Sequence, residues 1–194
     1  MSKKKNKGKP SIQSMEAELK RVKHRKRYIS VIRSTVYALI TVAAVAALVA
    51  TLWMPVLQIH GSSMAPTMED GNIIVTVKSG EHKCGDIIAF YHNNKILVKR
   101  VVAKAGDWVD IDESGNVYVN GVLLEEPYLQ SKAFGDCDLE FPYQVPAAKL
   151  FVLGDQRSVS SDSRISSIGC IAKDQIVGKI VFRVWPLSDF GTVG

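Results

Sequence analysis

The chain has 194 residues, of which 46% are hydrophobic and 23% charged, which fits one compact domain plus a further segment and excludes wholesale disorder. The net charge of +6 is uneven, because residues 1–34 hold 12 of the 25 Lys and Arg residues and only two acids. The other 160 residues carry 13 basic and 17 acidic side chains. A nucleic-acid-binding domain carries its positive charge on the folded body, so this distribution argues against nucleic acid as a partner.

The three cysteines, Cys84, Cys137 and Cys170, are too few and too scattered for a disulfide scaffold, and none forms a Cys-x-x-Cys pair. Neither a metal nor a cofactor is therefore expected. Cys137 and Cys170 could pair if the body is exported, but three small buried thiols fit the sequence equally well.

The chain begins with a basic tail, residues 1–34, that we expect to be cytoplasmic. Its Lys-rich start is interpreted as a solvated segment that fixes topology. Residues 15–27 could form a short helix on anionic lipid.

An apolar run follows the tail. Residues 34–68 contain no Asp, Glu, Lys or Arg, and residues 36–57 are broken only by Tyr37, Thr41 and Thr51. At about 1.5 Å per residue such a helix crosses a hydrocarbon core of about 30 Å. We predict a transmembrane helix over residues 35–57.

The charge distribution predicts the orientation of this helix, because basic residues favour the cytoplasmic side. The body, residues 58–194, should then be extracytoplasmic on a single-pass protein of the cell membrane. A cleaved signal peptide is the alternative. Its charged and apolar regions would both be unusually long, so a retained anchor is favoured.

The body is predicted to be mostly β, as an antiparallel domain without a long amphipathic helix beyond residue 60. Apolar runs alternate with turn signals, among them Asn120-Gly121, a type I′ hairpin pair, and Ser114-Gly115-Asn116. The expected strands are 73–77, 87–91, 97–103, 117–119, 122–124, 150–153 and 176–185.

The first segment that could carry chemistry is residues 61–68, directly after the apolar run. Ser63 lies between Gly61 and Pro66, where a turn can expose its hydroxyl and direct a backbone N–H at a developing oxyanion. A plain linker leaving the bilayer fits the same residues.

The second segment surrounds Lys99. In a strand, Lys99 shares a face with Leu97 and Val101, while Arg100 points the other way. Desolvation on an apolar face favours the neutral amine, which can act as a general base. Alternatively, Lys99 extends to solvent at a sheet edge or pairs with an acid.

The third segment runs from Gly154 to Arg164 and is dense in turn-forming residues. Asp162 and Arg164 could form an ion pair that braces the loop. An ordinary polar loop is the plainer interpretation.

Together, in this order and after one apolar span, the three segments resemble bacterial type I signal peptidases. The resemblance covers residues 36–187, and four motifs in order are far more specific than any one of them. The matching positions are Gly61, Ser63, Met64, Pro66, Thr67, Gly85, Asp86, Ile87, Lys99, Arg100, Val101, Gly106, Asp107, Gly154, Asp155, Arg157, Ser160, Asp162, Ser163, Arg164, Gly178, Lys179, Arg183, Val184, Trp185 and Pro186.

Three departures from the family pattern concern the loop and the oxyanion site. Gln156 replaces the usual Asn, and Ser158-Val159 replaces a common Asp-Asn. Gly61 stands where some relatives carry a Ser that helps bind the oxyanion. The single anchor resembles the compact Gram-positive form.

The resemblance implies a Ser-Lys dyad, with Ser63 as nucleophile and Lys99 as general base. It also implies that Ser160 orients the Lys99 amine and that Asp162 and Arg164 hold the loop carrying Ser160. Met64 would be a pocket wall. The implied substrates are signal peptides of exported preproteins with small residues at the first and third positions before the cut.

The implied partners are the lipid bilayer and, transiently, the secretion machinery. One alternative is a Ser-Lys protease dedicated to one precursor such as a pilin. An inactive membrane-anchored interaction module would have lost Ser63 or Lys99, and both are present. A self-cleaving repressor would need a DNA-binding domain in place of the span.

Overall fold

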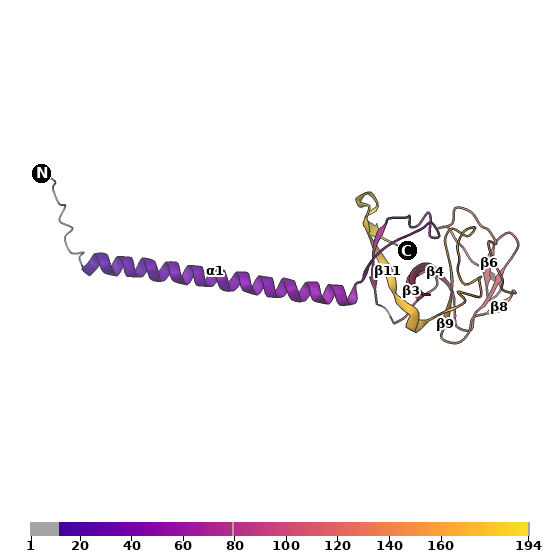
Figure 1. Ribbon diagram of the computed structural model, residues 1–194, viewed down its shortest axis with the longest axis horizontal. Coiled ribbons are helices and arrows are strands. Elements are labelled where there is room, and N and C mark those ends of the chain that lie inside the picture. Colours follow the sequence, from indigo (N-terminus) through magenta and orange to yellow (C-terminus); the bar gives the residue numbers. More distant parts are fainter. Residues whose placement is uncertain (1–11, 79, 194) are drawn as a thin grey trace. The chain divides into compact units, whose positions relative to one another are not determined.

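The computed structural model describes residues 12–78 and 80–193 (Figure 1). The chain divides into two compact units, Met1–Val49 and Ala50–Gly194. The Lys-rich start of the basic tail lies outside the described residues.

The helix α1 runs from Ile12 to Trp53, so the basic residues after position 12 belong to one continuous helix and not to a short separate one. Its apolar part makes α1 the one helix among the described residues that is long and apolar enough to cross a membrane.

The helix stops at Trp53, and the expected end at residue 57 is wrong. Pro55 is the cause, because a proline disfavours the helical conformation of the residue before it and cannot donate a helical hydrogen bond. Val56 and Leu57 lie instead in β1 (Val56–Gln58), paired with β2 (Ile73–Val77).

The second unit contains two antiparallel sheets, which confirms the predicted fold class of one helix followed by a β domain. The larger sheet has the strand order β1-β2-β11-β3-β4-β9-β10, with β12 paired to β11. Its remaining strands are β3 (Ile87–His92), β4 (Lys95–Lys104), β9 (Lys149–Leu153), β10 (Ile171–Ala172), β11 (Ile176–Trp185) and β12 (Gly191–Thr192).

The smaller sheet has the order β7-β6-β5-β8. Its strands are β5 (Trp108–Ile111), β6 (Val117–Val119), β7 (Val122–Leu123) and β8 (Tyr143–Gln144), and two short 3-10 helices, η1 (Lys173–Gln175) and η2 (Leu187–Asp189), complete the described elements. Figure 1 labels β3, β4, β9 and β11 of the larger sheet and β6 and β8 of the smaller sheet.

Side chains on both faces of the larger sheet are buried. In β4, Val101 packs in a cluster with Ile88 and Phe90, whereas the next residue, Val102, packs with Val109 of the smaller sheet. Successive side chains of a strand point to opposite faces, so each face of β4 contributes to a different part of the core. This arrangement holds the middle of β4, and with it Lys99, in a fixed position.

Candidate active site

The segment after β1 places Ser63 on a turn that is held by buried side chains of the same segment. Met64 and Met68 are 2% and 0% exposed and belong to a buried cluster with Ile74 and Ile180. Ala65 closes the turn by donating its N–H to the Ser62 carbonyl at 3.0 Å. Ser63 itself is half-buried, so its backbone is fixed by neighbours that face the core while its hydroxyl stays accessible.

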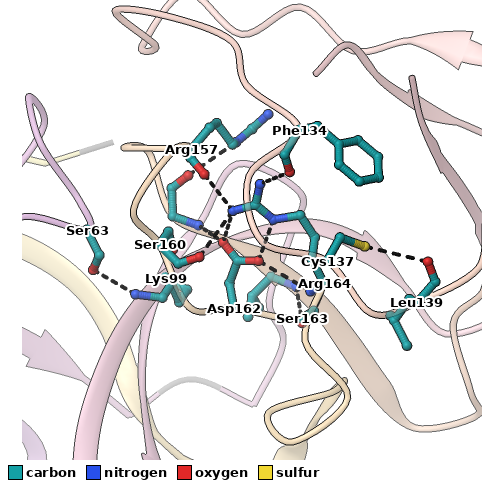
Figure 2. A network of polar contacts seen from close by, with 12 residues as sticks. Ser63, Lys99, Phe134, Cys137, Leu139, Arg157, Ser160, Asp162, Ser163 and Arg164 are labelled. Carbon is teal, nitrogen blue, oxygen red and sulfur yellow. Dashed lines mark hydrogen bonds and ion pairs between the residues drawn. The ribbon is translucent and has the colours of Figure 1, made fainter. Parts of the chain in front are cut away.

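Lys99 lies on β4 and reaches the turn from the sheet. Its Nζ is 2.7 Å from Ser63 Oγ, the distance of a short hydrogen bond, and the side chains meet as Figure 2 shows. Only 3% of Lys99 is exposed. Burial, which penalises the charged ammonium, is the main reason that the pKa of Lys99 falls to about 8.

Charges around Lys99 modify that effect in opposite directions. Asp162 and Asp155 raise the pKa of the Lys99 amine, while Arg164 lowers it. Both acids are paired with arginines, which limits the stabilisation that they give to an ammonium. A buried amine with a pKa near 8 can accept a proton close to neutrality, which a solvated lysine cannot.

The loop after β9 packs against the Ser63 turn and is braced by buried ions. Arg164 donates Nε–H to Asp162 at 2.8 Å, and its Nη2 donates to the carbonyls of Arg157 and Ser160 (Figure 2). Asp162 also accepts the Gly154 N–H at 3.0 Å. The ion pair therefore ties both ends of the loop together.

Ser160 does not make the hydrogen bond to Lys99 that the family resemblance implied. Its hydroxyl is buried and has no hydrogen-bond partner among the described residues, because the Lys99 amine is directed at Ser63. Ser160 instead packs against Gly154. A Cβ at Gly154 would overlap Ser160 Oγ and lie 2.6 Å from the Ser63 carbonyl oxygen, so only glycine fits between the loop and the nucleophile turn.

A second buried ion pair lies behind Lys99. Arg100 contacts both carboxylate oxygens of Asp155, at 2.9 and 2.7 Å, and donates to the Gly85 carbonyl at 2.9 Å. Thr67, on the nucleophile segment, donates its hydroxyl to Asp155. Asp155 thus connects the strand of Lys99 with the turn of Ser63.

Two residues of this network, Glu126 and Tyr128, were missed by the sequence interpretation. Glu126 forms a buried ion pair with Arg157, which also donates to the Gly154 carbonyl. Tyr128 donates its hydroxyl to Glu126 at 2.9 Å and places its ring 3.9 Å from the Arg100 guanidinium carbon. Burial and the charge of Glu126 raise the pKa of Tyr128. The available signal was that Glu126 and Tyr128 flank a proline, but their spacing from other residues did not indicate which side chains they would contact.

A groove of about 560 Å³ leads away from Ser63. Its walls are mostly apolar and come from the end of β1 with the following turn and from the first half of β4. The residues lining it are Leu57, Gln58, Ile59, His60, Ser63, Met64, Lys95, Ile96, Leu97, Val98 and Lys99. A groove with a β-strand in each wall suits an extended peptide.

The side chains of His60 and the three cysteines make no hydrogen bond to Ser63 or Lys99 among the described residues. His60 lines the groove 3.9 Å from Asp70, and it makes no hydrogen bond to Ser63 within the described residues. Cys84, Cys137 and Cys170 are all free thiols, so the Cys137–Cys170 disulfide is not formed.

Comparison with known proteins identifies the family of the chain. The family model described as signal peptidase, peptidase S26, matches residues 32–185. Signal peptidase IB of Staphylococcus aureus (strain COL) is 40% identical over 152 residues, which cover 68% of this chain and 78% of that protein. Signal peptidase I of Bacillus caldolyticus is 38% identical over 148 residues, covering 68% and 80%.

Among solved structures, a signal peptidase I from Enterococcus faecalis V583 aligns at 28% identity and a TM-score of 0.44, covering 51% of this chain and 96% of that one. The family model spans most of the chain, including the turn of Ser63, the strand of Lys99 and the loop of Asp162. The chain therefore belongs to the signal peptidase family, peptidase S26, and is an enzyme of the signal peptidase I type.

Proposed function

We propose that the chain is a membrane-anchored serine endopeptidase that removes signal peptides from exported preproteins, with Ser63 as nucleophile and Lys99 as general base. The observation that carries the proposal is the 2.7 Å contact between Lys99 Nζ and Ser63 Oγ at the end of a peptide-sized groove. A serine and a buried amine at this distance form a nucleophile and its base.

In the acylation step, the neutral Lys99 amine accepts the proton of the Ser63 hydroxyl as Oγ attacks the scissile carbonyl. A tetrahedral oxyanion forms, and the backbone N–H of Ser63 is the donor that we propose for its stabilisation. The resulting Lys99 ammonium then gives the proton to the departing amine of the mature protein. The C–N bond breaks and an ester links the signal peptide to Ser63.

In the deacylation step, the neutral Lys99 amine accepts a proton from a water molecule as that water attacks the ester. The second tetrahedral intermediate collapses, and Lys99 returns the proton to Ser63 Oγ. The signal peptide leaves with a free carboxylate, and the enzyme is regenerated. One amine thus serves both half-reactions, which requires a pKa near the working pH.

The proposal includes the surroundings of the enzyme. The apolar part of α1 is proposed as a single transmembrane anchor, with the basic residues before it in the cytoplasm and the β domain outside the membrane. Preproteins reach such an enzyme as they emerge from the secretion machinery, so transient contact with that machinery is part of the proposal.

The test is cleavage of a preprotein by the full-length protein in detergent. Wild type should release the mature protein with one new N-terminus, identified by mass spectrometry. Ser63→Ala and Lys99→Ala should each abolish cleavage, because the two residues act as a unit. Melting temperatures close to wild type show that both variants are folded. Cleavage by a folded Ser63→Ala protein would refute the proposed nucleophile.

A further inference from the structure

One wall of the groove is a strand with an open edge. β4 pairs with β3 from Lys95 to Arg100, but its pairing with β9 begins only at Arg100. Val101 exchanges hydrogen bonds with Gly85 and Asp86, both at 2.8 Å, on the β3 side. Hydrogen bonding alternates along an antiparallel strand, so the backbone groups of Ile96 and Val98 point to the open edge.

The opposite wall has an open edge as well. β1 is the last strand of the larger sheet on that side and pairs only with β2. Ile59 exchanges hydrogen bonds with Asn72 and Gly71, at 2.8 and 2.9 Å, on the β2 side. The alternation directs the backbone groups of Gln58 away from β2. An extended peptide in the groove can therefore add as a strand to either wall.

Lys95 lies at the end of the groove opposite Lys99. It is the first residue of β4 and pairs in register with His92, directly after the hairpin turn of Asn93 and Asn94. Its side chain is exposed and makes no ion pair with the acids of the described chain. The hairpin fixes the position of the Lys95 backbone, and the charged amine is available to bind a ligand.

We propose that Lys95 is a specificity-determining residue that favours an acidic and disfavours a basic side chain at the fifth residue before the cleavage site. This inference rests on the proposed function, because it takes the groove to hold the signal peptide. The substrates share the signal-peptide segment before the cut, whereas the mature proteins after the cut differ. The groove is therefore assigned to the segment before the cut.

The assignment to the fifth residue follows from strand geometry. Lys95 and Lys99 are four residues apart, about 13 Å along a strand. They share one face and have side chains of equal length, so their amines are offset by about the same distance. The carbonyl of the first residue before the cut lies beside Ser63 and Lys99. An extended substrate places a residue four positions upstream beside Lys95.

Electrostatics gives the sign of the preference. None of the described residues that line the groove is an acid. The ionisable lining residues are His60, Lys95 and Lys99, and Lys99 is the one whose burial disfavours the charged form. Lys95 therefore supplies the positive charge, and a carboxylate in the substrate meets no competing acid in the groove.

The experiment compares two peptides that are identical except for Glu or Lys at the fifth residue before the cut, using the full-length enzyme in detergent at low salt. We expect wild type to cleave the Glu peptide with about 2- to 5-fold higher kcat/KM, the range for an exposed ion pair. Lys95→Gln should remove the preference and Lys95→Glu should reverse it. The preference should fade at about 0.5 M NaCl, where screening is strong.

Lys104 provides the matched control, because it lies at the other end of β4, is exposed and does not line the groove. Lys104→Glu should keep the wild-type preference. Equal cleavage of both peptides by wild type, or a preference that persists in Lys95→Gln, would overturn the inference and leave the proposed function standing. Cleavage of neither peptide by wild type would overturn both.

Discussion

Arg100 and Tyr128 face each other with 3.9 Å between the guanidinium carbon and the centre of the ring. The same guanidinium binds Asp155, and the Tyr128 hydroxyl binds Glu126. The residue next to the proposed base is therefore held by groups far from it in sequence. Contacts of Glu126 and Tyr128 thus connect the active-site loop with the strand of Lys99.

Glu126→Gln should strongly destabilise the protein. The change leaves the buried guanidinium of Arg157 without a charge partner, which typically costs about 3–5 kcal/mol. Glu125, the preceding residue, is exposed, so Glu125→Gln should change the free energy of unfolding by less than about 0.5 kcal/mol. Denaturant titration of both variants checks this, and equal stabilities would contradict the proposed weight of the pair.

The cleavage rate should have an acid limb. Because the pKa of Lys99 is lowered to about 8, the neutral amine disappears as pH falls below that value. The rate should then drop about tenfold per pH unit. Lys99→Arg should be inactive from pH 6 to 10, since an arginine keeps its proton. An acid limb that vanishes in His60→Ala would identify His60, and not Lys99, as the base.

The same burial should make Lys99 a cost to stability near neutrality. The pKa of Lys99 falls from 10.5 to about 8 on folding, so between these values the unfolded chain binds the additional proton. Stability therefore rises with pH across that window, by about 3 kcal/mol in total. Lys99→Met lacks this pH-dependent contribution to the free energy of unfolding. Its stability advantage over wild type should be largest below pH 8 and shrink towards pH 10.5; an advantage independent of pH would contradict this account.

Gly154→Ala should impair catalysis. The new Cβ would overlap Ser160 Oγ and crowd the Ser63 carbonyl, which forces the loop away from the nucleophile turn. We expect at least a roughly tenfold loss of cleavage rate, because small displacements of reacting groups are costly. Gly191→Ala meets no atom within 4 Å and serves as the control with unchanged rate. A fully active Gly154→Ala enzyme would show that the loop tolerates displacement.

The proposed topology predicts a specific protection pattern. Protease added outside intact cells should digest the chain beyond β1 and spare the basic residues at the start of α1, because basic flanks remain in the cytoplasm. Antibodies against the two ends separate these fragments on a blot. Protection of the β domain in intact cells, with digestion only after lysis, would refute the orientation.

Sequence patterns predicted the strands that contain several apolar residues in a row. Residues 73–77, 117–119 and 176–185 coincide with β2, β6 and β11. The missed strands β8, β10 and β12 have two residues each, too few for an alternation to be visible. The short strands β6 and β7 were found because they flank the hairpin pair Asn120-Gly121. β1 was missed because its Val56 and Leu57 continue the apolar run that predicted the helix. β5 was missed because Asp110 interrupts its short apolar run, which consists of Trp108, Val109 and Ile111.

The candidate site was only partly accessible from the sequence. Ser63, Lys99, Asp162 and Arg164 stand in motifs that the family resemblance marks. Glu126 and Tyr128 do not, because they reach Arg157 and Arg100 only through tertiary folding. The hydrogen bond between Arg157 and Glu126 joins residues 31 positions apart. Ser160 shows the converse limit, since its motif position implied a hydrogen bond to Lys99 that its hydroxyl does not make.

The short distance in sequence between α1 and β1 determines how the enzyme can be cut free of its anchor. Only Met54 and Pro55 separate the two elements, and the Pro55 carbonyl accepts both the N–H and the hydroxyl of Thr76, at 2.9 and 3.0 Å. A soluble version that began at residue 58 would lack Val56 and Leu57, and with them most of the edge strand β1 and one lining residue of the groove. Pro55 is thus the latest residue at which a truncated, secreted or tethered form of this peptidase can begin and keep these contacts.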